Sequence, residues 1–156
     1  MPIGIGFDIH RLIEGKRLIL GGVSFEADKA AEGHSDGDVV LHALTDAMLG
    51  ASGLGDIGMH FPDYDMKYKN IPSKYFVQET LKLISNKYRI VNIDINIILE
   101  KPKLGNKKLI IKENISKLLR IKSNQVNVKA KSMEGLGEIG ENRAIMAQVV
   151  IELKKK

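Results

Sequence analysis

The chain has 156 residues, which is enough for about one ordinary domain with its own hydrophobic core. Hydrophobic residues make up 44% of it and charged residues 28%, with only 4 prolines, and this balance excludes collagen-like repeats and long disorder. Cysteine is absent, which excludes disulfides, thiolate metal sites and a cysteine nucleophile; a metal ion would sit on His, Asp, Glu or a ligand. The apolar runs are short and the N-terminal residues carry no cluster of charge, so we expect no membrane span, no secretory signal and a cytoplasmic location.

The charge balance is 24 basic against 19 acidic residues, a net charge of +5. Lysines gather between residues 101 and 117 and again at residues 154–156, without the interleaved aromatic residues that stack on bases. We therefore expect a solvated helix face and a basic tail, and no nucleic-acid partner. A small anionic ligand is compatible with this charge.

In the first third of the chain, alternation predicts a strand from Ile3 to Arg11. One face of this strand carries Ile3, Ile5, Phe7 and Ile9, and the other carries Gly4, Gly6, Asp8 and His10. Residues 17–25, with Gly21 and Gly22 in the middle, are typical of two short strands and a turn, and a loop is expected to follow through residues 29–36. The spacing then becomes helical, from an N-cap near Asp38 to a stop at Gly53.

The remaining elements follow the same two periodicities. In order they are a loop over residues 53–62, a helix introduced by Pro72 and Ser73, a strand over 89–99, a helix over 104–119, a strand over 126–130, a glycine-rich loop over 135–140, and a final strand over 144–153. No internal repeat or linker interrupts this order. We expect a single α+β domain over residues 1–156, with helices layered on a sheet.

The four histidines all lie within the first 60 residues, at His10, His34, His42 and His60. Asp8 and His10 leave the same face of the predicted strand, about 7 Å apart at the backbone, and can converge on one ion. His42 lies one turn into the first helix, away from its apolar stripe. Two histidines and a carboxylate match a catalytic zinc site with an open fourth position. The alternatives are a chance Asp-x-His pair and a histidine satisfied by ordinary surface or core contacts.

Asp46 lies one turn after His42 on the same helix face. It either steadies the imidazole ring of His42 or is an ordinary exposed helix carboxylate.

Three loops combine glycine with acidic residues, at residues 34–38, 55–65 and 132–137. Backbone N–H groups in such loops can approach phosphate, and the carboxylates can hold a hydrated Mg²⁺. Each loop taken alone is also consistent with ordinary turn and cap chemistry.

Six strings taken in order resemble the 2-C-methyl-D-erythritol 2,4-cyclodiphosphate synthase family over essentially the whole chain. They are Gly6-Phe7-Asp8-Ile9-His10, His34-Ser35-Asp36-Gly37-Asp38-Val39, Leu41-His42-Ala43-Leu44-Thr45-Asp46-Ala47, Leu54-Gly55-Asp56-Ile57-Gly58, Phe61-Pro62-Asp63 and Val126-Asn127-Val128-Lys129-Ala130. The resemblance implies a mixed four-stranded sheet with helices packed on one face. It also implies a homotrimer with active sites between adjacent subunits.

The same resemblance implies a reaction and its metals. The expected substrate is 4-diphosphocytidyl-2-C-methyl-D-erythritol 2-phosphate, whose 2-phosphate attacks the β-phosphorus, expels CMP and closes a cyclic diphosphate in the non-mevalonate isoprenoid pathway. By this resemblance Asp8, His10 and His42 bind Zn²⁺, and Glu134 holds Mg²⁺ or Mn²⁺ together with substrate phosphates. His34 and Ser132 match positions assigned to transition-state stabilisation.

The resemblance also implies which residues contact the substrate, in two groups. The first group is Asp8, Ile9, His10, His34, Ser35, Asp56, Ile57, Gly58, Phe61, Pro62, Asp63, Tyr64 and Asp65. The second, which includes the expected cytosine pocket, is Leu99, Glu100, Lys101, Pro102, Lys103, Leu104, Gly105, Lys131, Ser132, Met133 and Glu134. The chain departs from the family's pattern in the cytosine pocket at Pro102 to Asn106, at Glu138, and between Gly140 and Ala144, so no family role is carried onto Arg143.

Two other functions stay open at this point. One is a zinc-dependent phosphohydrolase that acts on a nucleotide diphosphate with the same three ligands. The other is a non-catalytic trimer that binds a nucleotide or an isoprenoid. The products distinguish the three functions. A cyclase gives CMP and a cyclic diphosphate, a hydrolase gives an open-chain product, and a binding module gives no product.

Overall fold

The computed structural model describes residues 1–33 and 35–156, and its main sheet has the strand order β4-β1-β7-β5-β6. Three long strands form its centre: β1 (Ile3–Glu14), β7 (Ala144–Lys155) and β5 (Tyr88–Ile98). β7 lies between the other two and is antiparallel to both. The α+β class and the mixed sheet predicted from the sequence are confirmed.

The two edge strands are short. β6 (Val126–Lys131) runs parallel to β5, and β4 (Lys29–Ala31) pairs antiparallel with the end of β1. The sheet thus has five strands where four were expected, because three residues of the predicted loop at 29–36 pair with Leu12, Ile13 and Glu14. A separate hairpin of β2 (Arg17–Leu20) and β3 (Val23–Glu26) turns at Gly21 and Gly22, as the sequence predicts.

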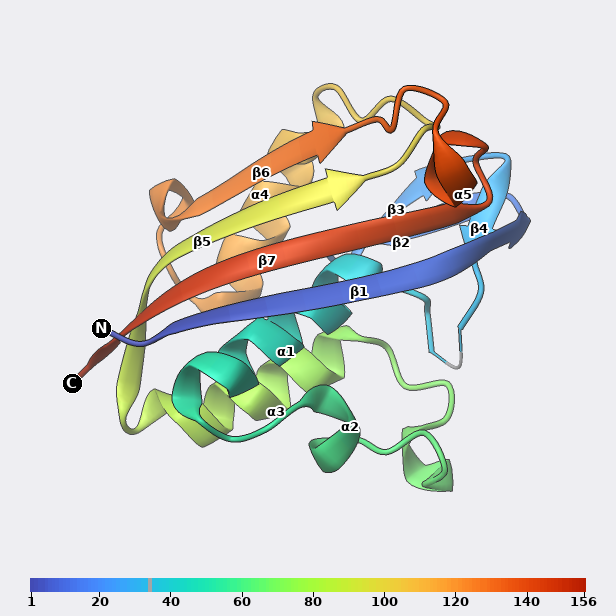
Figure 1. Cartoon of the computed structure of the whole chain (residues 1–156). Coiled ribbons are helices and arrows are strands. Elements are labelled where there is room, and N and C mark those ends of the chain that lie inside the picture. The colour runs from blue at the N-terminus through green and yellow to red at the C-terminus, as the bar shows by residue number, and fades with distance from the viewer. Residues whose placement is uncertain (34) are drawn as a thin grey trace.

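The three longer helices α1 (Val39–Ser52), α3 (Lys74–Ser85) and α4 (Lys107–Leu119) pack on one face of the sheet (Figure 1). The short helices are α2 (Ile57–His60), η1 (Met66–Tyr68), η2 (Ser123–Gln125) and α5 (Gly137–Gly140). α4 begins three residues later than predicted, since Gly105 has a positive φ of 46° and its turn precedes the helix. The core lies between α1 and the inner face of β5 and β7, where Leu44, Met48, Ile95 and Val149 are fully buried.

Asp38 fixes the start of α1. One of its carboxylate oxygens accepts hydrogen bonds from the N–H groups of Val40 and Leu41 at 3.1 Å, as an N-cap does. The carboxylate also accepts from Gly21 and Gly22 in the β2–β3 turn, although it is completely buried. The predicted cap therefore has a second role, since it joins the hairpin to the helix that carries His42.

β1 separates two very different surfaces. Gly4 and Gly6 face α1, and a Cβ atom added to Gly6 would lie 1.8 Å from the carbonyl oxygen of Ala43. The opposite face of β1 is apolar but carries no helix, so Ile3, Ile5, Phe7 and Ile9 remain 69%, 67%, 51% and 48% exposed. Exposed apolar stripes of this kind are typical of interaction surfaces.

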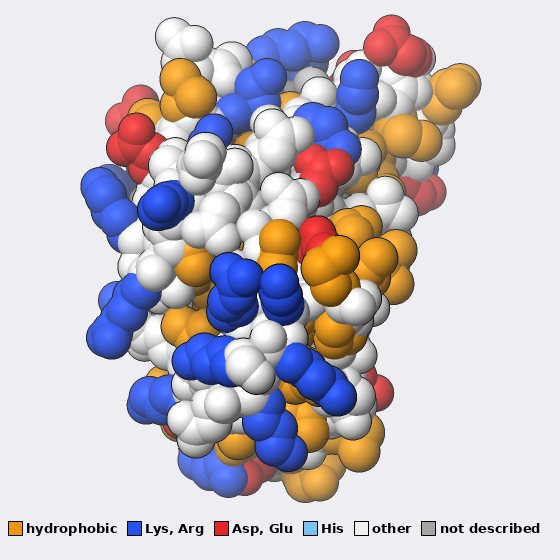
Figure 2. Space-filling model, turned by 90° about the vertical axis from the view of Figure 1, so that its left-hand side faces the viewer, with side chains coloured by type: hydrophobic (Ala, Val, Ile, Leu, Met, Phe, Trp, Pro, Cys, Tyr) orange, Lys and Arg blue, Asp and Glu red, His pale blue; other side chains and the backbone are white. Residues whose placement is uncertain are grey.

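Both chain ends lie at one end of the molecule, which Figure 2 shows face on. The N–H of Lys156 donates to the carbonyl of Lys87 at 3.0 Å, which places the predicted basic tail beside the start of β5. Lys and Arg side chains are spread over the lower part of this end. Within the described part of the chain, no helix is long and apolar enough to cross a membrane.

The contact between β1 and α1 gives a first prediction. Gly6→Ala should lower the free energy of unfolding by about 3 kcal/mol or more, because its Cβ would overlap backbone that cannot move aside. Gly50→Ala is the matched control: it lies in α1, where the nearest atom to its Cβ would be the carbonyl oxygen of Ile5 at 3.9 Å, an ordinary contact, and it should stabilise the protein by about 0.5–1 kcal/mol. Urea denaturation measures both. Equal, small effects would mean that the close approach does not constrain the fold.

Asp38 gives a second prediction. Burial raises the pKa of Asp38 from 3.8 to about 6, although N–H donors such as Gly22 oppose the shift. The folded protein then binds more protons than the unfolded chain between about pH 4 and 6, so this group's stabilisation is complete below pH 4 and is lost as the pH rises through 6. The free energy of unfolding of the wild type minus that of Asp38→Asn, which does not titrate, should be larger at pH 4 than at pH 7.5 by about 2 kcal/mol. A difference that grows with pH would contradict this.

Candidate active site

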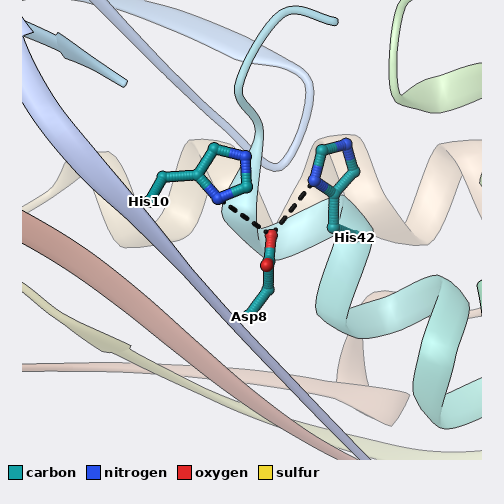
Figure 3. A group of neighbouring side chains, drawn as sticks. All are labelled: Asp8, His10 and His42. Atoms are coloured by element: carbon teal, nitrogen blue, oxygen red, sulfur yellow. Dashed lines mark hydrogen bonds and ion pairs between the residues drawn. The ribbon is translucent and has the colours of Figure 1, made fainter. Parts of the chain in front are cut away.

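Asp8, His10 and His42 converge on one point, as their spacing predicts. Asp8 Oδ2 lies 3.0 Å from His42 Nδ1 and 3.2 Å from His10 Nδ1 (Figure 3). One ligand atom from each residue lies within 4.8 Å of the other two. The three side chains are between 13% and 24% exposed, so the cluster is largely shielded from water yet open on one side.

The backbone contact between β1 and α1 sets this geometry. Asp8 follows Gly6 on the face of β1 that meets α1, and His42 precedes Ala43, the residue whose carbonyl oxygen lies against Gly6. The His42 N–H donates to the carbonyl of Asp38 at 3.1 Å, which places His42 in the first turn after the cap. The strand and helix can therefore present the three groups to each other only because Gly6 has no side chain.

The donor set fits a divalent cation. His10 Nδ1 is buried and, within the described residues, has no hydrogen-bond partner, although it lies 3.2 Å from the Asp8 carboxylate. The short separation is an ion-pair distance without hydrogen-bond geometry, so that nitrogen keeps a free lone pair or a proton beside a carboxylate. Two imidazole nitrogens and one carboxylate oxygen are ligands that Zn²⁺ accepts in catalytic sites.

A cavity of about 960 Å³ adjoins this cluster. Nine of the residues assigned to the substrate by resemblance line it, namely Asp8, Ile9, His10, Ser35, Ile57, Gly58, Phe61, Asp63 and Tyr64. Its wall also contains Tyr68 and Phe76, which the sequence did not single out as site residues; the ring centroids of Phe61 and Phe76 are 4.9 Å apart. An apolar helical position such as Phe76 is equally consistent with a core residue and with a cavity-lining residue, so no sequence signal distinguishes the two roles.

Two carboxylates shape the loop at residues 56–58. Asp46 accepts a hydrogen bond from the N–H of Ile57 at 3.1 Å, and Asp56 accepts from the N–H of Met59 at 2.9 Å. Asp46 thus holds the α2 loop and has a different partner from the His42 ring that the sequence suggested. It is also only partly exposed, since helix α2 covers it.

Asp65 has a local role within the same segment. Its carboxylate accepts from the N–H of Lys67 at 3.1 Å and pairs with the ammonium of that residue at 3.0 Å. The first of these bonds is the main reason that the pKa of Asp65 is lowered. The carboxylate therefore stays ionised and caps η1 at the rim of the cavity.

The second predicted group assembles at the ends of β5 and β6. The Leu99 N–H donates to the carbonyl of Lys131 at 3.0 Å, and the Met133 N–H donates to Glu100 Oε2 at 3.2 Å. Ser132 Oγ donates to Glu134 Oε1 at 2.7 Å, and Glu134 has a positive φ of 51°, which L-residues rarely adopt. These contacts bring the expected cytosine segment, Ser132 and Glu134 together on one surface.

The two groups do not meet within one chain. Among the described residues, none from 99–105 or 131–134 lines the cavity beside Asp8, His10 and His42. β7 separates β1, which carries Asp8 and His10, from β5 and β6, whose ends lead into the second group. A substrate that touches both requires a second copy or a rearrangement.

The sequence also singled out His34 and Arg143. His34 lies outside the described residues. Arg143 pairs with both carboxylates around it, Glu138 at 2.8 Å and Glu141 at 2.7 Å. These pairs are surface interactions next to α5 and form a local charge cluster.

Comparison with known proteins gives one consistent result. The family model described as the YgbB family matches residues 1–154. The chain is 50% identical over 151 residues to the 2-C-methyl-D-erythritol 2,4-cyclodiphosphate synthase of Desulfatibacillum aliphaticivorans, covering 96% of this chain and 97% of that protein.

Solved structures agree with this. The IspF of Plasmodium falciparum in complex with CDP has a TM-score of 0.86 and 40% identity over 99% of this chain and 96% of its own. The bifunctional IspDF of Campylobacter jejuni has a TM-score of 0.95 and 38% identity over 99% of this chain. The chain spans 42% of the length of that bifunctional protein.

Proposed function

Because the chain belongs to the YgbB family, we propose that it converts 4-diphosphocytidyl-2-C-methyl-D-erythritol 2-phosphate to 2-C-methyl-D-erythritol 2,4-cyclodiphosphate and CMP. This is a step of the non-mevalonate isoprenoid pathway, and its class is that of a phosphorus-oxygen lyase. The single observation that carries the proposal is the convergence of Asp8, His10 and His42 beside a cavity large enough for a sugar phosphate. The CDP in the Plasmodium falciparum complex supports a cytidine ligand.

The proposed reaction is an intramolecular phosphoryl transfer. A 2-phosphate oxygen forms a bond to the β-phosphorus while the bond to the departing CMP oxygen breaks, so no protein nucleophile is required. The difficulty is to hold two anionic groups in line. Zn²⁺ held by Asp8, His10 and His42, and Mg²⁺ or Mn²⁺ held by Glu134, would supply positive charge to the phosphate oxygens.

The protein residues then bind and orient the substrate. The Ser35 hydroxyl lies 3.2 Å from His42 Nε2 at the cavity wall, within reach of a phosphate bound at the metal ligands. Ile57 and Gly58, held by Asp46, are proposed to face the sugar hydroxyls. His34 and Ser132 are proposed to donate hydrogen bonds to the charge that develops on the transferring phosphoryl group, which is worth a few kcal/mol per donor.

We propose that a homotrimer completes the site. The residues around Asp8 and those around Glu134 do not share a cavity in one chain, and the apolar stripe Ile3, Ile5, Phe7 and Ile9 has no covering helix. Packing this stripe against other copies would bury it and bring the cytosine segment of one subunit to the metal ligands of the next. A site of this kind exists only in the assembly.

Product analysis tests the activity. Incubation of the protein with the cytidylyl substrate, Zn²⁺ and Mg²⁺ should give CMP and a cyclic diphosphate by phosphorus NMR. An open-chain product would favour the zinc-dependent phosphohydrolase. Binding without turnover would favour the non-catalytic trimer. Both of these alternatives lack support from the named relatives, which are synthases.

Substitutions at the two proposed metal sites should have different effects on zinc content and on rate. Asp8→Asn removes the negative charge of one of three protein ligands and so weakens the set, and bound zinc and turnover should both fall. Glu134→Gln leaves those ligands intact, so zinc content should stay near that of wild type while the rate falls by ~10²-fold, or roughly 3 kcal/mol of leaving-group stabilisation. Zinc content is measured by atomic emission, and the rate by CMP release.

Glu113→Gln, an exposed carboxamide substitution on α4, is the matched control and should change neither quantity. Excess Mn²⁺ should restore part of the rate of Glu134→Gln. If Glu134→Gln loses its zinc, or keeps full activity with zinc as the only metal, Glu134 does not hold a second ion.

The assembly has its own test. Ile5→Glu places a charge in the apolar stripe, and we expect it to sediment as a monomer with native circular dichroism and no turnover. Leu109→Glu, at a residue 61% exposed on α4, should remain a trimer. A wild-type protein that is monomeric and fully active at micromolar concentration would refute the shared site.

A further inference from the structure

Both ring nitrogens of His42 make a polar contact. Its Nδ1 atom faces Asp8 Oδ2 at 3.0 Å, and its Nε2 atom lies 2.8 Å from Ser73 Oγ. The Ser73 hydroxyl in turn donates to Asp36 Oδ1, and the Ser73 N–H donates to Asp36 Oδ2 at 3.1 Å. Asp36 therefore holds both polar hydrogens of Ser73.

We propose that Asp36 and Ser73 are positioning residues that fix the tautomer and orientation of the His42 ring for metal binding. The inference deepens the proposed function, since it rests on His42 being a ligand. Neither residue touches the reacting atoms in this scheme; both act through His42. The consequence is that Nε2 carries the proton and Nδ1 presents its lone pair beside Asp8.

The proton inventory leads to this assignment. A serine hydroxyl has one hydrogen, and that of Ser73 is committed to Asp36, so Ser73 Oγ can only accept from His42 Nε2–H. A neutral imidazole with Nε2 protonated has its free lone pair on Nδ1. Nδ1 and the Asp8 carboxylate then face each other as two acceptors at 3.0 Å, an arrangement that favours a cation between them.

The position of Ser73 directly before α3 supports a role beyond helix capping. Ser73 precedes α3 at its N-cap, where a serine side chain usually accepts from the backbone of the first turn, yet it makes no such bond here. It is completely buried, and its hydroxyl points to Asp36 and His42 instead. Ser35 Oγ lies 3.2 Å from His42 Nε2 as well, but it is Ser73 that the carboxylate orients.

The competing explanation is a structural tether. By this reading Asp36 and Ser73 only join the loop after β4 to the start of α3, and the contact with His42 follows from proximity. Both explanations predict a loss of thermal stability when the pair is broken. They differ in metal affinity and in the protonation pattern of His42, which a tether does not control.

Zinc affinity of the full-length chain, measured by competition with a chromophoric chelator, separates the two. Ser73→Ala should weaken zinc binding by 10- to 100-fold, the range typical of lost partners of a metal-bound histidine. Ser73→Thr keeps a hydroxyl and should recover most of the affinity. Asp36→Asn keeps that hydroxyl but leaves one acceptor oxygen for the two Ser73 donors, the O–H and the N–H, and should weaken binding to an intermediate degree.

Ser85→Ala is the matched control, since its hydroxyl lies in the same helix and donates only to the local carbonyl of Lys82. It should bind zinc as wild type does. Nitrogen-15 NMR of the zinc-loaded protein gives the second measurement: one histidine of the wild type should show a slowly exchanging Nε2–H that is lost in Ser73→Ala. If Ser73→Ala does not fold, Asp36→Asn carries both measurements.

Unchanged zinc affinity in folded Ser73→Ala and Asp36→Asn would overturn the inference and leave the tether. A different result would refute the proposed metal site itself. In that case the wild type would bind no zinc, or Asp8→Asn would bind zinc as well as the wild type does.

Discussion

The close approach of the α1 backbone to β1 is the constraint on which the rest of the structure depends. A helix and a strand normally pack through side chains, yet Gly4 and Gly6 let the carbonyl groups of Ala47 and Ala43 lie directly against the strand. The approach puts the first turn of α1 within hydrogen-bond distance of the next inward residue of β1, which is Asp8. The chain thus uses the absence of two side chains to bring three others together.

A second anchor fixes the rotation and the start of α1. Asp38 caps the helix and accepts hydrogen bonds from the β2–β3 turn with the same carboxylate, so the start of the helix is held against that turn. Because His42 follows one turn later, its ring direction depends on this buried group as well as on the glycines. The placement of the polar side chains in the site therefore depends on these backbone contacts.

Local chemistry in the sequence was sufficient to predict much of this arrangement. Alternation located β1, helical spacing located α1, and the carboxylate at Asp38 and the glycine at Gly53 marked its two ends, which the structure confirms. The strand and helix periods suggested Asp8, His10 and His42 as a metal-binding set, and the family resemblance favoured it over a chance pairing. These features depend on neighbours along the chain, and sequence carries that information directly.

What the sequence could not predict depends on contacts between distant segments. The three-residue strand β4 pairs only because Leu12 to Glu14 lie beside it, and the partner of Asp46 proved to be Ile57 instead of the His42 ring. Ser73 is 31 residues from His42, so its hydroxyl reads as a helix cap until the fold brings the two together. Alternation likewise assigned residues to the two faces of β1 without showing which face meets the helices.

The uncovered face of β1 connects the fold to the proposed chemistry. A protein that buried this apolar stripe under its own helix would gain stability, but the inward face of the same strand is already committed to α1 and the metal ligands. In the proposed trimer, other copies of the chain would cover the stripe. The residues around Glu134, which a single chain keeps apart from Asp8, would then have a route to the same substrate. Oligomerisation and the completion of the proposed site would then depend on opposite faces of one strand. A change on either face of β1 would therefore affect both the assembly and the site.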